Sequence, residues 1–379
     1  MEITDIAGVY CNGVKEGKFG LGLVKCSGTV AGVFTRNKIK AAPVIVCTEN
    51  IADGYVKGII VNSGNANAFT GEQGIEDARE MCRIAAGLFG CNEWEVAVAS
   101  TGVIGRRLDM EWIRVKAPEV YTGLGNTKAH ADNFARSIIT TDRFVKKTCS
   151  EKARIAAVAK GAGMIAPNMA TMLCFIFTSA KFDSGELYEM LRKAVDRSFN
   201  RLTVDGDTST NDTVLLVSTG RERVDAGIFE EELEKVCYSL AKQMARDGEG
   251  TTRVFEVAVD GAASDEDADR IARTVASSLL VKTAIFGCDP NWGRIVAAVG
   301  YSGADVDEKI TLSFENQTDR VLLVDCGRPV GNEREARELL KNSEEFVIKI
   351  ELEKGKGKGF AIGCDLSYDY VKLNSEYTT

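Results

Sequence analysis

The stretch on which the interpretation of the chain depends is "KGAGMIAPNMATMLCFIF", residues 160–177. A segment with two glycines and a proline runs directly into the apolar residues 172–177, and Thr171 stands at the junction. A continuous apolar run is typical of a strand buried on both faces. Pro167 biases Ala166 towards an extended backbone, and Pro-Asn favours a turn. The local pattern alone favours a structural role, with Thr171 as the first residue of a core strand.

A chemical role for Thr171 is the alternative hypothesis. A threonine hydroxyl is a weak nucleophile without a base, and the only histidine, His130 in "NTKAHADNFARSI", has the surroundings of a solvated helix face. Cleavage of the Ala170–Thr171 bond would create an α-amine within reach of the Thr171 hydroxyl. Because such an amine has an ordinary pKa of about 8, it can act as the base. One residue then supplies nucleophile and base.

The composition limits the classes of function. A length of 379 residues suggests about two domains, and 45% hydrophobic with 27% charged residues is typical of a soluble globular protein. A formal charge of −8, without a basic cluster interleaved with aromatics, argues against nucleic acid and anionic membranes as partners. No signal peptide or membrane span is expected. The 11 cysteines form no CxxC pair, which indicates reduced thiols in a cytoplasm and no structural zinc.

Strand and helix patterns alternate in the first half of the chain. Short strands are predicted at residues 20–25, 29–34 and 42–48, and two further strands, 57–71 and 95–105, end in polar loops. The second of these loops begins at Thr101–Gly102. Apolar residues at helical spacing predict a helix over 74–90 that closes at Gly90.

The second half has the same mixture. Helices are predicted over 183–199, 229–248 and 264–280, and strands over 252–261, 309–317 and 320–327. The segment 346–367 has the pattern of a hairpin with "GKGKGF" at its turn. No repeat or long linker divides the chain, so a layered α+β sandwich is the expected fold class.

Four segments suggest a bound ion or phosphate at first sight, but none of them supports one. "DGDTSTND", from Asp205, would need Gly and Glu where Thr210 and Leu216 stand to be a calcium loop. The acids 265–269 are explained by the dipole at a helix start. "NSGNANAFTG" and "GKGKGF" match neither glycine-rich nucleotide motif. We therefore expect no metal and no cofactor.

At this point the sequence resembles the ornithine acetyltransferase family, the glutamate N-acetyltransferases of arginine biosynthesis (ArgJ type). The resemblance spans nearly the whole chain and rests on "NSGNANAFTG", "ASTGVIG", "TTD", "KGAGMIAPNMATML", "DGDTSTND", "RDGEG", "GCDPNWGRI" and "DYVKLNSEYTT". It implies self-cleavage between Ala170 and Thr171 into an α chain, 1–170, and a β chain, 171–379. The implied fold is similar to that of the N-terminal-nucleophile hydrolases, often assembled as α2β2.

The resemblance also implies the site residues. Thr171 is then the nucleophile, and Thr101 and Gly102 form the oxyanion hole. The implied substrate contacts are Thr141, Lys160, Thr171, Glu249, Asn374 and Thr379. Lys160 suits a substrate carboxylate and Glu249 suits an ammonium group.

The expected reaction is transfer of acetyl from N2-acetyl-L-ornithine to L-glutamate through an acetyl-Thr171 ester, giving ornithine and N-acetylglutamate. Whether acetyl-CoA also serves as donor, whether ornithine inhibits, how many protomers assemble and whether cleavage is complete stay open. Two alternatives also stay open: an aminopeptidase or amidase of the same self-processing architecture, and a non-enzymatic binding protein in which Thr171 is part of the core.

Overall fold

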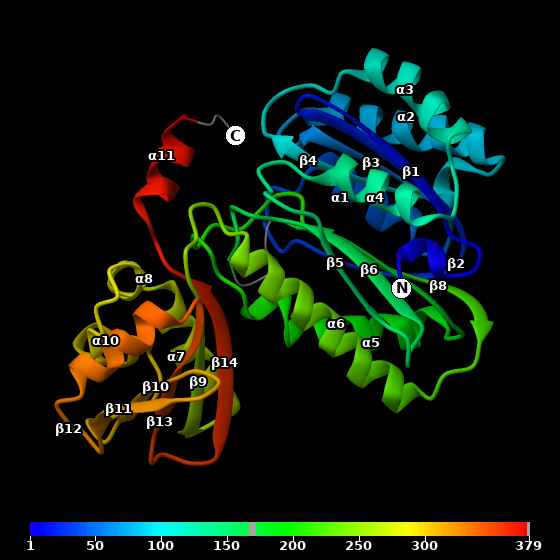
Figure 1. Ribbon diagram of the computed structural model, residues 1–379. Coiled ribbons are helices and arrows are strands. Elements are labelled where there is room, and N and C mark those ends of the chain that lie inside the picture. The colour runs from blue at the N-terminus through cyan, green and yellow to red at the C-terminus, as the bar shows by residue number, and fades with distance from the viewer. Residues whose placement is uncertain (167–171, 377–379) are drawn as a thin grey trace. The chain divides into compact units, whose positions relative to one another are not determined.

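The computed structural model describes residues 1–166 and 172–376, which form two compact units (Figure 1). The first unit comprises Met1–Asn200 and Asp207–Leu240, and the second comprises Arg201–Gly206 and residues 241–376. Each unit contains one mixed sheet with its own helices. No helix in the described part of the chain is long and apolar enough to cross a membrane.

The sheet of the first unit has eight strands in the order β4-β3-β2-β8-β7-β6-β5, with β1 paired to β2. Its strands are β1 (Tyr10–Glu16), β2 (Phe19–Phe34), β3 (Tyr55–Asn65), β4 (Val96–Val103), β5 (Lys146–Ser150), β6 (Ile155–Lys160), β7 (Leu173–Ala180) and β8 (Thr213–Glu222). The strands predicted at 57–71 and 95–105 are confirmed as β3 and β4.

The long strand β2 connects the two halves of this sheet. Its first part pairs with β1 and β3, and its last part, Thr29–Phe34, pairs with β8. The register against β3 shifts between Lys25 and Gly28, which marks a β-bulge. The segments 20–25 and 29–34, predicted as separate strands, are therefore one strand, because a bulge interrupts alternation without ending the strand.

Helices cover both faces of the first part of β2. Lys25 lies over the Tyr121 ring of α3, whereas Gly22 contacts Phe134 and Ser137 of α4. Odd and even positions of a strand point to opposite faces, so α3 and α4 lie on opposite sides of it. The helices of this unit are α1 (Ala42–Asn50), α2 (Gly71–Phe89), α3 (Met110–Thr122), α4 (Lys128–Ile138), α5 (Ser184–Asp196) and the first part of α6 (Ala226–Arg246), with short 3-10 turns at Ile3–Asp5, Glu93–Glu95 and Phe199–Arg201.

Residues 42–48 are helical, so the strand predicted there is wrong. An apolar run alone does not distinguish a buried strand from a buried helix. Pro43 stands in the first turn of α1, where its fixed φ and missing N–H are favourable. The Thr48 hydroxyl donates to the Val44 carbonyl one turn earlier. The helices predicted over 74–90 and 183–199 are confirmed, with a left-handed Gly90 and an Asp183 capping box at their ends.

Strand β7, which follows the junction, is buried on both faces as its sequence predicts. Leu173, Phe175 and Phe177 belong to the large core that includes α4, and Phe175 meets Phe134 edge to face. Cys174, on the other face, is close enough to Cys237 of α6 to affect its pKa. Strand β7 therefore packs between α4 on one face and α6 on the other.

The second unit has a six-stranded sheet in the order β12-β11-β10-β13-β9-β14. Its strands are β9 (Val254–Ala262), β10 (Thr311–Glu315), β11 (Arg320–Asp325), β12 (Arg328–Pro329), β13 (Glu345–Glu351) and β14 (Gly357–Cys364). Its helices are the end of α6, α7 (Asp265–Ser277), α8 (Leu279–Phe286), α9 (Trp292–Gly300), α10 (Glu333–Asn342) and α11 (Tyr368–Glu376). The helices predicted over 229–248 and 264–280 and the strands 252–261, 309–317 and 320–327 are confirmed, although the helix near 264–280 ends at Ser277.

The hairpin predicted over 346–367 is wrong. Strands β13 and β14 both exist, but each pairs with β9, which lies between them. The connecting residues cross the end of β9, where Leu352 N–H donates to Asp260 and Lys354 N–H donates to Gly261. The crossing is close: a Cβ on Gly261, at φ +77°, would lie 1.9 Å from the Leu352 carbonyl oxygen. Alternation identifies strands but not their partners.

Two mixed sheets, each combined with helices, make the chain an α+β protein, as the sequence predicts.

Candidate active site

Thr101 and Gly102, the predicted oxyanion hole, lie near the end of β4. Thr101 is buried, at 3% exposure, and its neighbour across the sheet is Ser63 of β3. At Gly102 the backbone has φ +134°, and a Cβ there would lie 2.3 Å from the Gly64 carbonyl carbon and 2.4 Å from the Asn65 nitrogen. Only glycine fits, because the backbone of β3 passes directly against it.

The ammonium group of Lys160 donates a hydrogen bond of 3.0 Å to the Thr101 hydroxyl oxygen. Lys160 is the last residue of β6 and is 2% exposed. Four strands separate β4 from β6 in the sheet order, which would be roughly 24 Å in a flat sheet at the usual strand spacing. The contact therefore requires the sheet to curve strongly, so that β4 and β6 approach each other. The long strand β2 pairs with β3 in one half of the sheet and with β8 in the other.

Asp142 supplies the counter-charge to this lysine. Its carboxylate accepts from Lys146 at 2.6 Å and from the backbone N–H groups of Gly161 at 2.7 Å and Thr140 at 3.0 Å. Burial by itself would raise the pKa of Asp142, but the charges of Lys160 and Lys146 outweigh it and lower that pKa to about 2. Asp142 is therefore an anion at neutral pH, held inside the protein by two lysines.

Lys15 brings a further amine to this region. Its Nζ donates to Ser63 Oγ at 2.8 Å and to the Ile139 carbonyl at 2.6 Å. Burial, with the charge of Lys160, lowers the pKa of Lys15 to about 8, while Asp142 opposes the shift. Among the described residues, Lys15, Lys146 and Lys160 all lie near the ionised carboxylate of Asp142, so several cationic groups gather in this region. Such an environment favours an anionic substrate group.

Asp212 holds the start of β7. Asp212 is fully buried, and its Oδ1 accepts from Met172 N–H at 3.0 Å. Burial raises the pKa of Asp212 well above its usual value, against the opposing effects of Met172 N–H and Lys160. Asp212 closes the motif "DGDTSTND", whose role here is structural: Asn211 donates to the Ala66 and Ser100 carbonyls next to Thr101.

The register of β6 and β7 connects the junction with the oxyanion pair. Lys160, at the end of β6, pairs with Leu173, the first residue of β7. The same lysine contacts Thr101. The ends of β6 and β7, which flank residues 167–171, are therefore both close to Thr101 through Lys160.

The other predicted site residues divide into three groups. Thr141 follows Thr140 in the loop that carries Asp142 and is half-buried. In the second unit, the Asn374 amide donates to Glu249 Oε2 at 2.8 Å, so these two predicted substrate contacts lie together. Ala170, Thr171 and Thr379 lie outside the described residues.

The predicted surface role of His130 is consistent with its contacts. It lies in the first turn of α4, where its ring nitrogen is 2.7 Å from the Thr127 hydroxyl in a capping box. The described residues contain no group of three or more His, Cys, Asp or Glu side chains that could hold a metal ion. The acids 265–267 occupy the first turn of α7, as the dipole explanation predicts.

Comparison with known proteins decides the family. Residues 6–379 match the model of the ArgJ family. The chain belongs to the ArgJ family. It is 76% identical over 379 residues, the whole of both chains, to "Arginine biosynthesis bifunctional protein ArgJ" of Archaeoglobus fulgidus. It is 50% identical to "Glutamate N-acetyltransferase" of Methanothermobacter thermautotrophicus, over all of this chain and 97% of that protein.

A solved ArgJ structure supports the same fold. The crystal structure of arginine biosynthesis bifunctional protein argJ from Bacillus halodurans is 42% identical, with a TM-score of 0.50, and the match covers 54% of this chain and 98% of that one. The present ArgJ chain is therefore an acyltransferase of arginine biosynthesis. Family membership sets aside the non-enzymatic alternative.

Sequence reasoning missed Lys15, Asp142, Lys146 and Asp212 as parts of this region. Asp142 and Asp212 each close a family motif, "TTD" and "DGDTSTND", so position within a motif was an available signal for both. No local signal marks Lys15, which comes from β1 and meets the site only through the folded sheet.

Proposed function

We propose that the protein transfers the acetyl group of N2-acetyl-L-ornithine to L-glutamate through an acetyl ester on Thr171, giving L-ornithine and N-acetyl-L-glutamate. The observation that carries the proposal is the Lys160–Thr101 hydrogen bond beside Gly102, at the point where Lys160 pairs with Leu173. This arrangement brings donors suited to an oxyanion close to the start of β7.

Thr101 is suited to donate because Lys160 already occupies one of its acceptor positions. An ammonium group has only donors, so Thr101 Oγ accepts from Lys160 and keeps its own hydrogen for another acceptor. A cation bound to the oxygen also makes that hydrogen a stronger donor. The Thr101 hydroxyl and the Gly102 N–H then receive the charge that develops on the acetyl oxygen.

The Ala170–Thr171 bond would first be cut, leaving the α chain, 1–170, and the β chain, 171–379. The crystallised chain of the Bacillus halodurans relative corresponds to only 54% of this sequence. Residues 171–379 are a similar share of it, which supports a division of the chain near residue 170.

In the first half-reaction, the Thr171 α-amine accepts the hydroxyl proton while Oγ attacks the acetyl carbon. The tetrahedral intermediate then expels the ornithine amine, which takes that proton from the Thr171 ammonium group. In the second half-reaction, the glutamate amine attacks the ester carbonyl carbon and gives a proton to the Thr171 amine. The tetrahedral intermediate then expels Thr171 Oγ, which takes that proton back from the ammonium group, and N-acetylglutamate leaves. Both steps use the chain's own groups and need no cofactor.

One recognition set would serve both substrates in turn, because both share an α-amino-acid core. We assign to it Thr141, Lys160, Glu249, Asn374 and Thr379. The positive region around Lys15 and Lys160 suits a carboxylate, and Glu249 suits an ammonium group. An aminopeptidase or amidase using water as acceptor would have no need of this paired set.

A second donor, acetyl-CoA, is favoured by one observation: the Archaeoglobus fulgidus relative is named a bifunctional protein. We also propose a cytoplasmic α2β2 assembly.

Purified protein should be assayed with acetylornithine plus glutamate and, separately, with acetyl-CoA plus glutamate. Formation of N-acetylglutamate in the first assay supports the proposed reaction. Its absence, in protein whose cleavage is verified by mass spectrometry, would refute it, and the second assay decides the donor range.

A further inference from the structure

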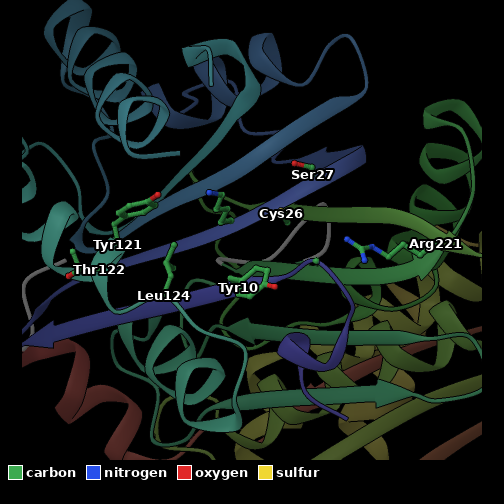
Figure 2. Close-up of a pocket in the computed structure, with 9 residues that line it drawn as sticks. Tyr10, Cys26, Ser27, Tyr121, Thr122, Leu124 and Arg221 are labelled. Carbon is green, nitrogen blue, oxygen red and sulfur yellow. The ribbon is translucent and has the colours of Figure 1, made fainter. Parts of the chain in front are cut away.

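A cavity of about 530 Å³ lies in the first unit (Figure 2). Its lining comes from the N-terminal segment and β1, from the bulge of β2, from the end of α3 and from the end of β8: Gly8, Tyr10, Lys25, Cys26, Ser27, Tyr121, Thr122, Leu124 and Arg221. In the view of Figure 2, Tyr121 and Arg221 stand at opposite ends of the cavity and Tyr10 lies between them. The volume is typical of sites for small molecules.

The strand registers show that this cavity is separate from the acyl-transfer region. Lys25 pairs with Gly58, which pairs with Val96 at the start of β4. Thr101 lies five residues further along β4, or roughly 17 Å at the usual rise per residue. None of the residues that line the cavity belongs to the set proposed for acetyl transfer.

The charged side chains that line the cavity are both cations. Among the described residues, neither Lys25 nor Arg221 has an ion-pair partner, although the chain as a whole has an excess of acid. Glu222, next to Arg221, bonds instead to Arg154 and Ser179. Lys25 lies over the Tyr121 ring, with its Nζ 5.9 Å from the ring centroid. Two unpaired cations facing one cavity favour an anionic ligand.

Local backbone features shape this arrangement. The bulge in β2 falls between Lys25 and Gly28, and such a bulge redirects the side chains beside it. At Gly8, φ is +94° and a Cβ would lie 2.8 Å from the Arg221 guanidinium nitrogen, so glycine leaves room for Arg221. Burial raises the pKa of Cys26 to about 12, which keeps its thiol protonated and unreactive at neutral pH.

We propose that this cavity binds a small organic anion, a phosphate or carboxylate group attached to a flat apolar body. The anionic group is held between Lys25 and Arg221, with Ser27 as a neutral donor. The flat body packs against Tyr10, Tyr121 and Leu124. An arginine fork is well suited to either anion, and the tyrosines supply apolar surface with polar edges.

Titration calorimetry on the full-length protein tests this with phenyl phosphate, benzoate and phenol. Saturable binding of phenyl phosphate or benzoate, with none of phenol, is the expected result, and the preferred anion identifies the head group. Arg221→Gln and Lys25→Gln should each weaken binding about tenfold or more. Arg223→Gln is the matched control, because it removes the same charge from the same exposed segment outside the cavity, and it should bind as the unaltered protein does.

Acetyl-transfer activity of each variant serves as the check that it is folded, since neither residue belongs to the proposed catalytic set. Absence of saturable binding of both anions at about 10 mM would overturn the proposal. Binding that is unchanged in both Arg221→Gln and Lys25→Gln would overturn it as well.

Discussion

The Thr101 hydroxyl makes two hydrogen bonds in the proposed mechanism: its oxygen accepts from Lys160, and its hydrogen donates to the oxyanion. Removing one oxyanion donor typically lowers turnover about 10²–10³-fold. Thr101→Ala should therefore lower kcat for acetyl transfer by this factor, measured with protein whose cleavage state is known. Thr101→Ser keeps the hydroxyl and should retain most of the turnover. A near-normal kcat in cleaved Thr101→Ala would remove Thr101 from the mechanism.

Asp142 is predicted to stabilise the fold in a pH-dependent way. Its carboxylate is buried beside Lys146 and Lys160, so Asp142→Asn removes a buried negative charge that interacts with both ammonium groups. A loss of about 3 kcal/mol in the free energy of unfolding in urea at pH 7 is expected.

The sign of the pH effect follows from the lowered pKa. The folded-state pKa is about 2 and the ordinary value is 3.8, so the ionised carboxylate stabilises the protein above about pH 4 and loses this effect as the pH falls towards 2. The difference in unfolding free energy between the unaltered protein and Asp142→Asn should shrink by about 2 kcal/mol over that range. A difference that stays constant from pH 5 to pH 2 would contradict this assignment.

At this scale, sequence identified Thr101, Gly102 and Lys160 but not their relation. Resemblance to a family supplied the names of these residues. Only the folded sheet shows that Lys160 donates to Thr101 and that Lys160 affects the pKa values of Lys15 and Asp142. Contacts between β1, β4 and β6 depend on the pairing of β2 with strands far away in the sequence, which no local pattern encodes.

At the scale of elements, the end of β4 needs glycine for two reasons: the positive φ of Gly102 and the close approach of the β3 backbone. A second glycine with positive φ alone allows the two effects to be measured separately. Gly102 has positive φ and also lies against the β3 backbone, whereas Gly105 has φ +77° and no atom within 4 Å of the position that a Cβ would take. Gly105→Ala should cost about 1 kcal/mol of stability. Gly102→Ala should cost about 2–4 kcal/mol, because β4 must also move away from Gly64.

Thermal unfolding midpoints and kcat measure the two effects together. Gly102→Ala should lower both, since the shift moves Thr101 and the Gly102 N–H, while Gly105→Ala should lower the midpoint only slightly. If Gly102→Ala and Gly105→Ala lowered the midpoint and kcat equally, the close approach of β3 and β4 would contribute neither to stability nor to catalysis.

The elements that sequence predicted correctly are those with a clear period or a cap. Helices α2 and α5 have regular apolar faces and end or begin at Gly90 and Asp183. The errors arose where the pattern was ambiguous. The apolar run of α1 fits a strand equally well, and β13 and β14 are adjacent in sequence although β9 lies between them in the sheet.

At the scale of the whole molecule, the proposed cleavage would fall inside one sheet rather than between the two units. Strand β6, from residues 1–170, pairs with β7, and β2 pairs with β8, so both proposed chains build the same core. After cleavage the chains should elute together in size-exclusion chromatography and separate only in denaturant. Separation under native conditions would contradict this arrangement. Length and composition suggested two domains, but only the fold shows that their boundary differs from the proposed cleavage position.

The central claim, acetyl transfer through Thr171 at a new chain terminus, is tested most directly by intact mass spectrometry under denaturing conditions. Purified protein is incubated with N2-acetyl-L-ornithine alone, without glutamate, and quenched rapidly. The account predicts two chains, 1–170 and 171–379, with one acetyl group on Thr171 of the second chain, and loss of that group when glutamate is added. A single uncut chain, or two chains without an acetylated form, would contradict it.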